Sequence, residues 1–449
     1  MHDFTEQKLV LYPILASSEF TKMLSLITLV FILGYAAIAF EHPIKINKTA
    51  SALLTGVLCW TIYVLSGLGE THQIVESLSH HLGSVAEILF FLLGAMTIVE
   101  LVDAHHGFKV ITDRISTRNV MKLMWIISIV TFFLSSVLDN LTTAIVMVSL
   151  LRKLLPAGEM RKLFAGIVII AANAGGAWSP IGDVTTTMLW IGGQVTTVNI
   201  MKMLFIPSVV SLIVPLLYLS YTMRNVGSLP EIALSKANDK TPDGSKIMFA
   251  LGVASLLFVP IFKTITHLPP YMGILFGLAV VWIASEIIHK DKDEEARRPF
   301  TASHALSRID SSSVLFFLGI LISIGCLEST GMLSGLAHWM DEKIGNMELI
   351  VSAIGLASAV IDNVPLVAAS MGMYSLENFP SDHKLWEMMA YCAGTGGSIL
   401  IIGSAAGVAV MGMEKIDFIW YLKRISLLAL LGYISGTLTY LLVFGMVSH

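Results

Sequence analysis

Long apolar tracts constrain this chain more than any other feature of its sequence. The tracts 23–40, 200–221 and 421–447 are each long enough to cross a ~30 Å hydrocarbon core, which takes ~20 helical residues. Only 13% of the residues are Asp, Glu, Lys or Arg, well below the share in soluble domains, and these charges are gathered between the tracts. A soluble protein with so few charges could not cover its surface. The sequence therefore predicts an all-α polytopic membrane protein.

Ten apolar segments fit single transmembrane helices, and two longer segments do not. The predicted crossings are 21–40, 49–67, 84–104, 161–190, 200–223, 246–262, 269–289, 310–329, 384–412 and 420–446. The segments 120–155 and 347–375 are interrupted by polar turns at Asp139-Asn140 and Asp362-Asn363. We predict that both segments are re-entrant hairpins, because a polar turn at membrane depth is tolerated only inside protein or beside water.

The distribution of basic residues supports this topology. With ten crossings and two hairpins, 22 of the 28 Lys and Arg residues fall on one side, which the positive-inside rule makes cytoplasmic. If either hairpin were a crossing, every later loop would change sides and the asymmetry would largely vanish. Both termini are then predicted outside, so either a leader preceded Met1 or the short tail was translocated directly. The sequence contains no basic stripe with interleaved aromatic residues, so it does not indicate a nucleic-acid partner.

Polar motifs recur in the same order in the two halves of the chain. Asp139-Asn140 matches Asp362-Asn363 at an offset of 223 residues, and 173–183 matches 394–404 at an offset of 221. Each half has five crossings, an odd number, so we predict two inverted repeats, which bind substrate near the membrane midplane. The predicted domains are a first repeat at 1–223 with hairpin 120–155 and broken helix 161–190, a cytoplasmic linker at 224–245, and a second repeat at 246–449 with hairpin 347–375 and broken helix 384–412.

Asp139 and Asp362 are acids at mid-membrane depth, and an asparagine follows each of them. A carboxylate that faces lipid costs at least ~2.5 kcal/mol, so an intramembrane acid indicates function by default. At a hairpin tip, the carboxylate, free carbonyls and the amide oxygens of Asn140 and Asn363 can ligate a hard cation such as sodium. The alternative is that each Asp only caps the helix that follows it. The symmetry of the pair favours ion binding.

The run from Asn173 to Asp183 cannot form a continuous helix. Two glycines, Pro180 and Gly182 interrupt it within an apolar segment. The matching run, 394–404, is rich in glycine but lacks proline. Close packing through small residues would explain the glycines but not a buried acid. We predict a sodium site at Asp139, Asp183 and Asp362, with further ligands at Asn173, Thr395, Ser398 and Ser404.

Glu100, Asp103 and His106 are spaced to lie on one face of a helix, whereas the adjacent His105 points elsewhere. This stripe at a helix end, together with His105, indicates a proton relay or a sensor of cytoplasmic pH, because histidine titrates near neutrality. The alternative is a polar cluster that snorkels to the membrane surface. The sequence contains no nucleophile–base motif or phosphate-binding loop, so we expect neither an enzyme nor a cofactor.

The motifs at 96–107, 136–144, 173–183 and 359–365 resemble those of the NhaD-type sodium/proton antiporters. That family belongs to a wider superfamily that includes dicarboxylate and citrate carriers, which place a Ser-Asn-Thr triplet at each hairpin tip. The resemblance implies a homodimer with a static scaffold and an elevator-like moving core.

This chain departs from the anion carriers at the residues that would contact the cargo. Asp139 and Asp362 replace the serine of each tip, and Asp183 adds a third carboxylate. Three converging carboxylates would repel a dicarboxylate and attract sodium, or protons when sodium is absent.

We therefore predict secondary antiport of Na⁺, and also Li⁺, against H⁺, with the cation and the proton competing for the midplane acids. One alternative is an anion carrier for a dicarboxylate or a metalloid oxyanion. The other is a passive channel or a non-transporting membrane sensor. The expected location is a bacterial inner membrane.

Overall fold

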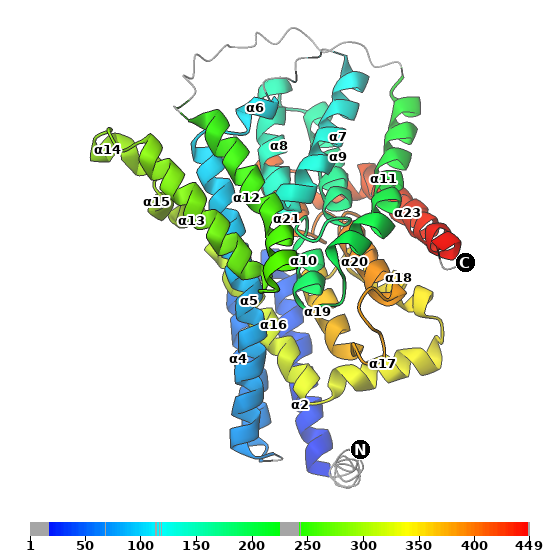
Figure 1. The fold of residues 1–449 in the computed structure, drawn as a ribbon. Coiled ribbons are helices and arrows are strands. Elements are labelled where there is room, and N and C mark those ends of the chain that lie inside the picture. Colours follow the sequence, from blue (N-terminus) through cyan, green and yellow to red (C-terminus); the bar gives the residue numbers. More distant parts are fainter. Residues whose placement is uncertain are drawn as a thin grey trace. The chain divides into compact units, whose positions relative to one another are not determined.

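A computed structural model describes residues 18–67, 69–112, 115, 117, 119–224, 242 and 244–447. The predicted linker 224–245 and the predicted outer location of both termini fall largely outside these residues. The regular elements are helices, as expected (Figure 1). Within these described ranges, eight helices are long and apolar enough to cross a membrane, and the bent pair α22–α23 would make a ninth. The prediction of an all-α polytopic membrane protein is confirmed, whereas the number of ten crossings stays a prediction.

The chain divides into two compact units, each assembled from separate stretches of sequence. The first unit comprises residues 1–89, 310–345 and 368–375, and the second comprises 90–309, 346–367 and 376–449. These units differ from the two predicted sequence repeats, because each of them draws on both halves of the chain. The division of the chain into two inverted repeats therefore stays a prediction.

In the first unit, α4 packs against both α2 and α16. Glycines allow the close approach of α4 and α16, since a Cβ added at Gly319 would lie 2.5 Å from the backbone N of Leu53. The helices of this unit are α2 (Ser18–Ala39), α3 (Glu41–Ile44), α4 (Lys48–Leu65), the start of α5 (Thr71–Ala104), α16 (Ser311–Ser329), α17 (Met332–Lys343) and the end of α19 (Asn363–Met373).

Helix α5 begins at Thr71, well before the predicted start at residue 84. The early turns are polar, so a search for apolar segments detects only the second part of the helix. Ser77 and His81 of these turns both hydrogen-bond to Ser329 Oγ, at 2.8 and 2.9 Å. Packing against the end of α16 thus satisfies side chains that hydropathy alone would assign to a loop.

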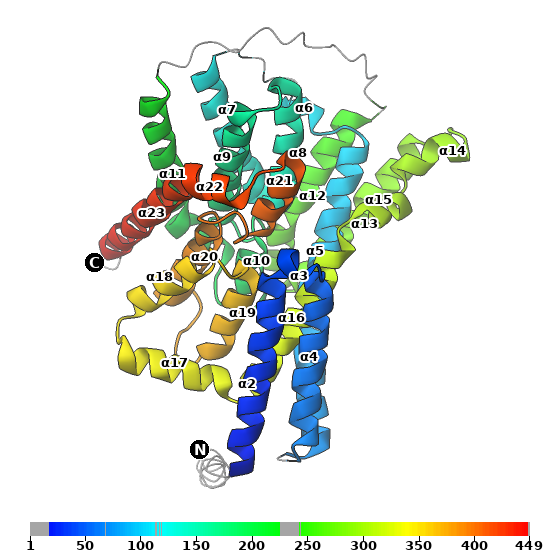
Figure 2. The same ribbon diagram turned by 180° about the vertical axis from the view of Figure 1, so that it is seen from behind.

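The second unit contains the first predicted hairpin, residues 347–367 of the second predicted hairpin and both predicted broken helices. Figures 1 and 2 show α7, α8 and α9 side by side, and α11 packs along α23. The elements of this unit are the end of α5, α6 (Lys109–Thr112), α7 (Val120–Leu138), α8 (Asn140–Leu154), α9 (Glu159–Gly176), α10 (Val184–Ile191), α11 (Thr197–Thr222), α12 (Ser245–Thr266), α13 (Pro270–Ile288), α14 (Glu294–Arg297), η1 (Arg298–Phe300), α15 (Ala302–Arg308), α18 (Met347–Ala357), the start of α19, α20 (Lys384–Gly396), α21 (Ala405–Glu414), α22 (Phe418–Arg424) and α23 (Ser426–Val447).

The predicted interruptions lie where the sequence placed them. Helices α7 and α8 meet at Asp139, and α18 and α19 are separated by residues 358–362. The run 177–183 separates α9 from α10, and 397–404 separates α20 from α21. Because α7 alone is long enough to span a bilayer, the re-entrant character of the first hairpin stays a prediction.

Candidate ion-binding site

Asp139 is the only residue between α7 and α8, and its backbone is strained. Its φ of 89° is a conformation that residues with a side chain rarely adopt. The Asp139 carboxylate accepts hydrogen bonds from the backbone N and the hydroxyl of Thr142, at 2.8 and 2.7 Å. The helix-capping alternative is therefore what the structure shows for Asp139, and capping leaves lone pairs on both oxygens for a cation.

The second hairpin tip follows the same arrangement at Asp362. Its carboxylate accepts a hydrogen bond from the backbone N of Val364 at 3.2 Å, and α19 then begins at Asn363. Asn363 is buried, as is Asn140 at the first tip. Each tip thus places an Asp at the start of a helix and turns the following Asn inward.

Glycines in the broken helices allow direct contact with the hairpin backbones. A Cβ added at Gly175 would lie 2.1 Å from the carbonyl oxygen of Phe132, and one added at Gly396 would lie 2.0 Å from that of Gly355. The two contacts occupy positions matched by the sequence repeat.

A pair of serine hydrogen bonds follows the same repeat. The Ser135 hydroxyl donates to the carbonyl of Ala172 at 2.6 Å, and the Ser358 hydroxyl donates to that of Ala393 at 3.0 Å. In both halves, therefore, the first arm of the hairpin is fixed to the helix that precedes the break.

Asp183 lies at the centre of the polar network and is 1% exposed. One oxygen accepts hydrogen bonds from the backbone N and the hydroxyl of Thr185, both at 2.9 Å. The other accepts from the Asn140 amide at 2.6 Å, and the Asn363 amide lies 3.5 Å from both oxygens. The asparagines of both hairpin tips thus meet at one carboxylate.

Asn173 extends this network to the second broken helix. Its oxygen accepts a hydrogen bond from the Asn140 amide at 3.0 Å. Its own amide donates to the hydroxyls of Ser398 and Ser404, at 2.9 and 3.0 Å. Six of the nine predicted ion-binding residues are therefore joined by hydrogen bonds: Asn140, Asn173, Asp183, Asn363, Ser398 and Ser404.

The other three predicted ion-binding residues lie outside the network of hydrogen bonds just described. Asp139 and Asp362 accept from their own helix starts, and the Thr395 hydroxyl donates to the carbonyl of Tyr391 at 2.6 Å. Within the described ranges, no three residues of the types His, Cys, Asp and Glu are grouped closely enough to hold a metal ion. Asp183 nevertheless lies within electrostatic range of both Asp139 and Asp362.

A cavity of about 20 Å³ touches Asp139 and Asp183. One water-sized sphere occupies ~10–15 Å³, so the cavity has room for about one water molecule or one bare ion. Thr187 is the third polar residue of the lining, and the remaining lining residues are apolar: Phe91, Leu92, Ala95, Met96, Val137, Leu138, Ile181, Val184 and Leu256.

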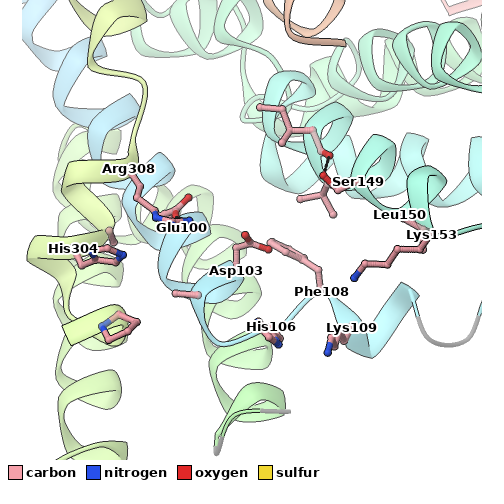
Figure 3. A pocket seen from close by; sticks show the side chains of 15 residues that line it. Glu100, Asp103, His106, Phe108, Lys109, Ser149, Leu150, Lys153, His304 and Arg308 are labelled. Carbon is pink, nitrogen blue, oxygen red and sulfur yellow. Dashed lines mark hydrogen bonds and ion pairs between the residues drawn. The ribbon is translucent and has the colours of Figure 1, made fainter. Parts of the chain in front are cut away.

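Glu100, Asp103 and His106 line a second, larger cavity of about 480 Å³ (Figure 3). His106 does not continue the predicted helical face, because α5 ends at Ala104 and His106 has a φ of 53°. Glu100 faces Arg308 of α15 at 3.8 Å, and Lys109 and Lys153 also line this cavity with Asp103 and His106. His105 points away, as predicted. It is buried, and its Nε2 lies 3.0 Å from Nε2 of His289.

Several residues that shape these sites were not among the residues predicted from the sequence. Thr142 and Thr185 hold the carboxylates of Asp139 and Asp183, and Arg308 faces Glu100 from a distant segment. A threonine two or three residues after an Asp is a recognisable capping pattern, so the two threonines carried a signal. Nothing in the local sequence around Arg308 indicates its partner.

Comparisons with known proteins agree with the resemblance seen in the motifs. A family model described as "Citrate transporter" (CitMHS) matches residues 35–391. The chain is 55% identical to "Sodium/proton antiporter 1" and 52% identical to "Sodium/proton antiporter 2" of Arabidopsis thaliana. Each match covers 92% of this chain, with 72% and 98% of the respective relative. It is 32% identical to "Na(+)/H(+) antiporter NhaD" of Vibrio cholerae, over 92% of this chain and 91% of that protein. Plant and bacterial relatives both occur, so the predicted bacterial inner membrane stays a prediction.

Proposed function

The chain belongs to the NhaD-type group of the citrate transporter family, is a transporter rather than an enzyme, and we propose that it exchanges sodium ions for protons. Relatives that carry the name sodium/proton antiporter support this activity over most of the chain.

The observation that carries the proposal is the environment of Asp183. This carboxylate is buried, and its hydrogen-bond donors in the described part of the chain are all neutral: Asn140, Asn363 and Thr185. A buried charge without a partner of opposite sign is costly, so the site gains free energy when a cation or a proton neutralises it. Sodium and a proton then compete for the same oxygens, and this competition is sufficient for antiport.

Asp139 and Asp362 supply the remaining charge of the proposed site. Each caps a helix next to the network, and both act electrostatically on the region around Asp183. Amide and hydroxyl oxygens of Asn140, Asn363, Asn173, Ser398, Ser404 and Thr395 are the proposed neutral ligands, since sodium prefers oxygen. The small cavity has a volume that suits about one ion.

Two contacts between the segments that contain the broken helices support their movement as one body, as an elevator mechanism requires. Glu414 at the end of α21 contacts Arg161 near the start of α9 at 2.7 Å. Beyond α10, the backbone N and the hydroxyl of Thr196 donate to the Asp382 carboxylate at 2.6 and 2.7 Å, close to the start of α20. We propose this movement, a homodimer and Li⁺ as a second cargo, and assign cytoplasmic proton access to Glu100, Asp103 and His106.

Everted membrane vesicles with an acid interior test the proposal. Addition of NaCl or LiCl, but not KCl or sodium-free citrate, is expected to raise the internal pH, followed with a pH-sensitive dye. The response should disappear in Asp183→Asn, Asp139→Asn and Asp362→Asn. Asp417→Asn is the control, because the Asp417 carboxylate also caps a helix, α22, but at an exposed position.

The same assay separates the rival functions. Citrate uptake that persists in the three variants would identify an anion carrier. Sodium flux without proton movement would identify a channel, and the absence of any flux in folded protein would favour a sensor.

A further inference from the structure

Three consecutive threonines follow Asp183 on α10, and they differ in what their hydroxyls bind. The Thr185 hydroxyl donates to the Asp183 carboxylate, and the Thr186 hydroxyl donates to the Asp183 carbonyl, both at 2.9 Å. The Thr187 hydroxyl makes no hydrogen bond within the part of the chain that the structure describes, although the residue is buried. Its hydroxyl is therefore available to a partner in the cavity that the residue lines.

Thr187 lines the cavity of about 20 Å³ that also touches Asp139 and Asp183. It lies about one helical turn after Asp183, the residue that caps the start of α10. Asp139, Asp183 and Thr187 are the three residues of this lining that have polar side chains. The cavity therefore offers carboxylate and hydroxyl oxygens within an otherwise apolar wall.

We propose that the Thr187 hydroxyl is a direct ligand of the transported cation, together with the carboxylates of Asp139 and Asp183. The cation is sodium or lithium, and only this naming of the cargo depends on the proposed antiport. A hydroxyl turns freely, so its oxygen can face a bound cation and its hydrogen can face a carboxylate when the cation leaves. Thr187 thus stabilises both the loaded and the unloaded site, which a purely apolar wall cannot do.

Sodium binding to purified protein at alkaline pH tests the assignment without requiring transport. Thr187→Val removes the hydroxyl and keeps the shape, and is expected to weaken sodium binding about tenfold or more. Thr187→Ser keeps the hydroxyl and should bind sodium nearly as the wild type does. The matched control is Thr131→Val, because Thr131 is equally buried but donates to its own helix, to the Ile127 carbonyl at 2.6 Å. Thermal unfolding of each variant, with Thr187→Ala as a second deletion, shows that the protein remains folded.

The outcomes distinguish this inference from the proposed function. Wild-type sodium affinity in folded Thr187→Val or Thr187→Ala means that Thr187 only packs, and overturns the inference. If Asp183→Asn also binds sodium normally, the proposed site itself is wrong. If sodium binding is lost in Thr187→Val while the wild type moves no protons, the ligand assignment stands and antiport fails.

Discussion

Asp139 combines a carboxylate of the proposed site with an unusual backbone conformation. A residue with a side chain is strained at this positive φ, whereas glycine adopts it without strain. Its carboxylate caps α8 and faces the small cavity. Replacement therefore has two consequences that can be measured independently.

We expect Asp139→Gly and Asp139→Ala both to abolish sodium-dependent proton movement, since both remove the carboxylate. Both also lose the cap, yet Asp139→Ala should be less stable than Asp139→Gly by about 1 kcal/mol because of the positive φ. Thermal unfolding in detergent gives the difference. An alanine variant as stable as the glycine variant would mean that the backbone at this tip is not strained.

At this scale the sequence singles out the candidate acids but does not predict which side chains contact them. Asp139, Asp183 and Asp362 stand out because acids are costly in apolar segments. That Asp183, rather than the tip acids, receives both asparagines depends on side-chain directions across segments 180 residues apart. Spacing within one segment carries no information about such contacts.

At the scale of elements, backbone contact between hairpins and broken helices depends on glycine. Gly175→Ala would bring a Cβ within 2.1 Å of the Phe132 carbonyl oxygen, so α7 and α9 would have to separate. We expect a loss of at least about 1–3 kcal/mol in the free energy of unfolding, together with loss of transport.

Gly335→Ala is the matched control for this change. Gly335 also lies within a helix, α17, and an added Cβ meets nothing within 4 Å. Its stability should be unchanged or slightly higher, because alanine favours helix. Equal thermal unfolding of the two variants would show that the contact at Gly175 is not tight.

Glu414 connects three elements of the second unit and is nearly inaccessible, with a side chain 1% exposed. It contacts Arg152 of α8 and Arg161 of α9, each at 2.7 Å. Glu414→Gln would leave two guanidinium groups without their carboxylate, and should lower the free energy of unfolding by about 2 kcal/mol or more.

Replacement of Arg152 and of Arg161 should lower the free energy of unfolding by different amounts. The Arg152 side chain is 44% exposed and that of Arg161 is 18% exposed, so water screens the first pair more strongly. Arg161→Ala is therefore expected to destabilise the protein more than Arg152→Ala. The reverse order would show that exposure does not govern these pairs.

At the scale of the whole molecule, the fold class followed from composition, but helix ends did not. Apolar length located most of the described helices that could cross a membrane, and Gly, Pro and Asp located the breaks. The polar start of α5 was missed because its stabilising contacts lie on α16. The large cavity likewise depends on α15, which no apolar pattern predicts.

Cysteine labelling can test the predicted topology of the second hairpin. Lys343 and Ser381 flank α18 and α19 and are exposed, as is Lys290, which lies before α16. Lys343→Cys and Ser381→Cys should react with an impermeant thiol reagent from outside, and Lys290→Cys only from the cytoplasm. The three native cysteines are buried and give little background. If Ser381→Cys instead reacts from the same side as Lys290→Cys, the segment 347–375 crosses the membrane and is not re-entrant.

The convergence of both hairpin asparagines on Asp183 has a consequence for energy conversion. One carboxylate shared by the two tips presents the same binding step to an ion arriving from either face. Under the proposed exchange, such a carrier has no built-in direction. The electrochemical gradients alone set the direction of exchange. If the sodium concentration outside were sufficiently higher than that inside, the same molecule would import sodium and export protons.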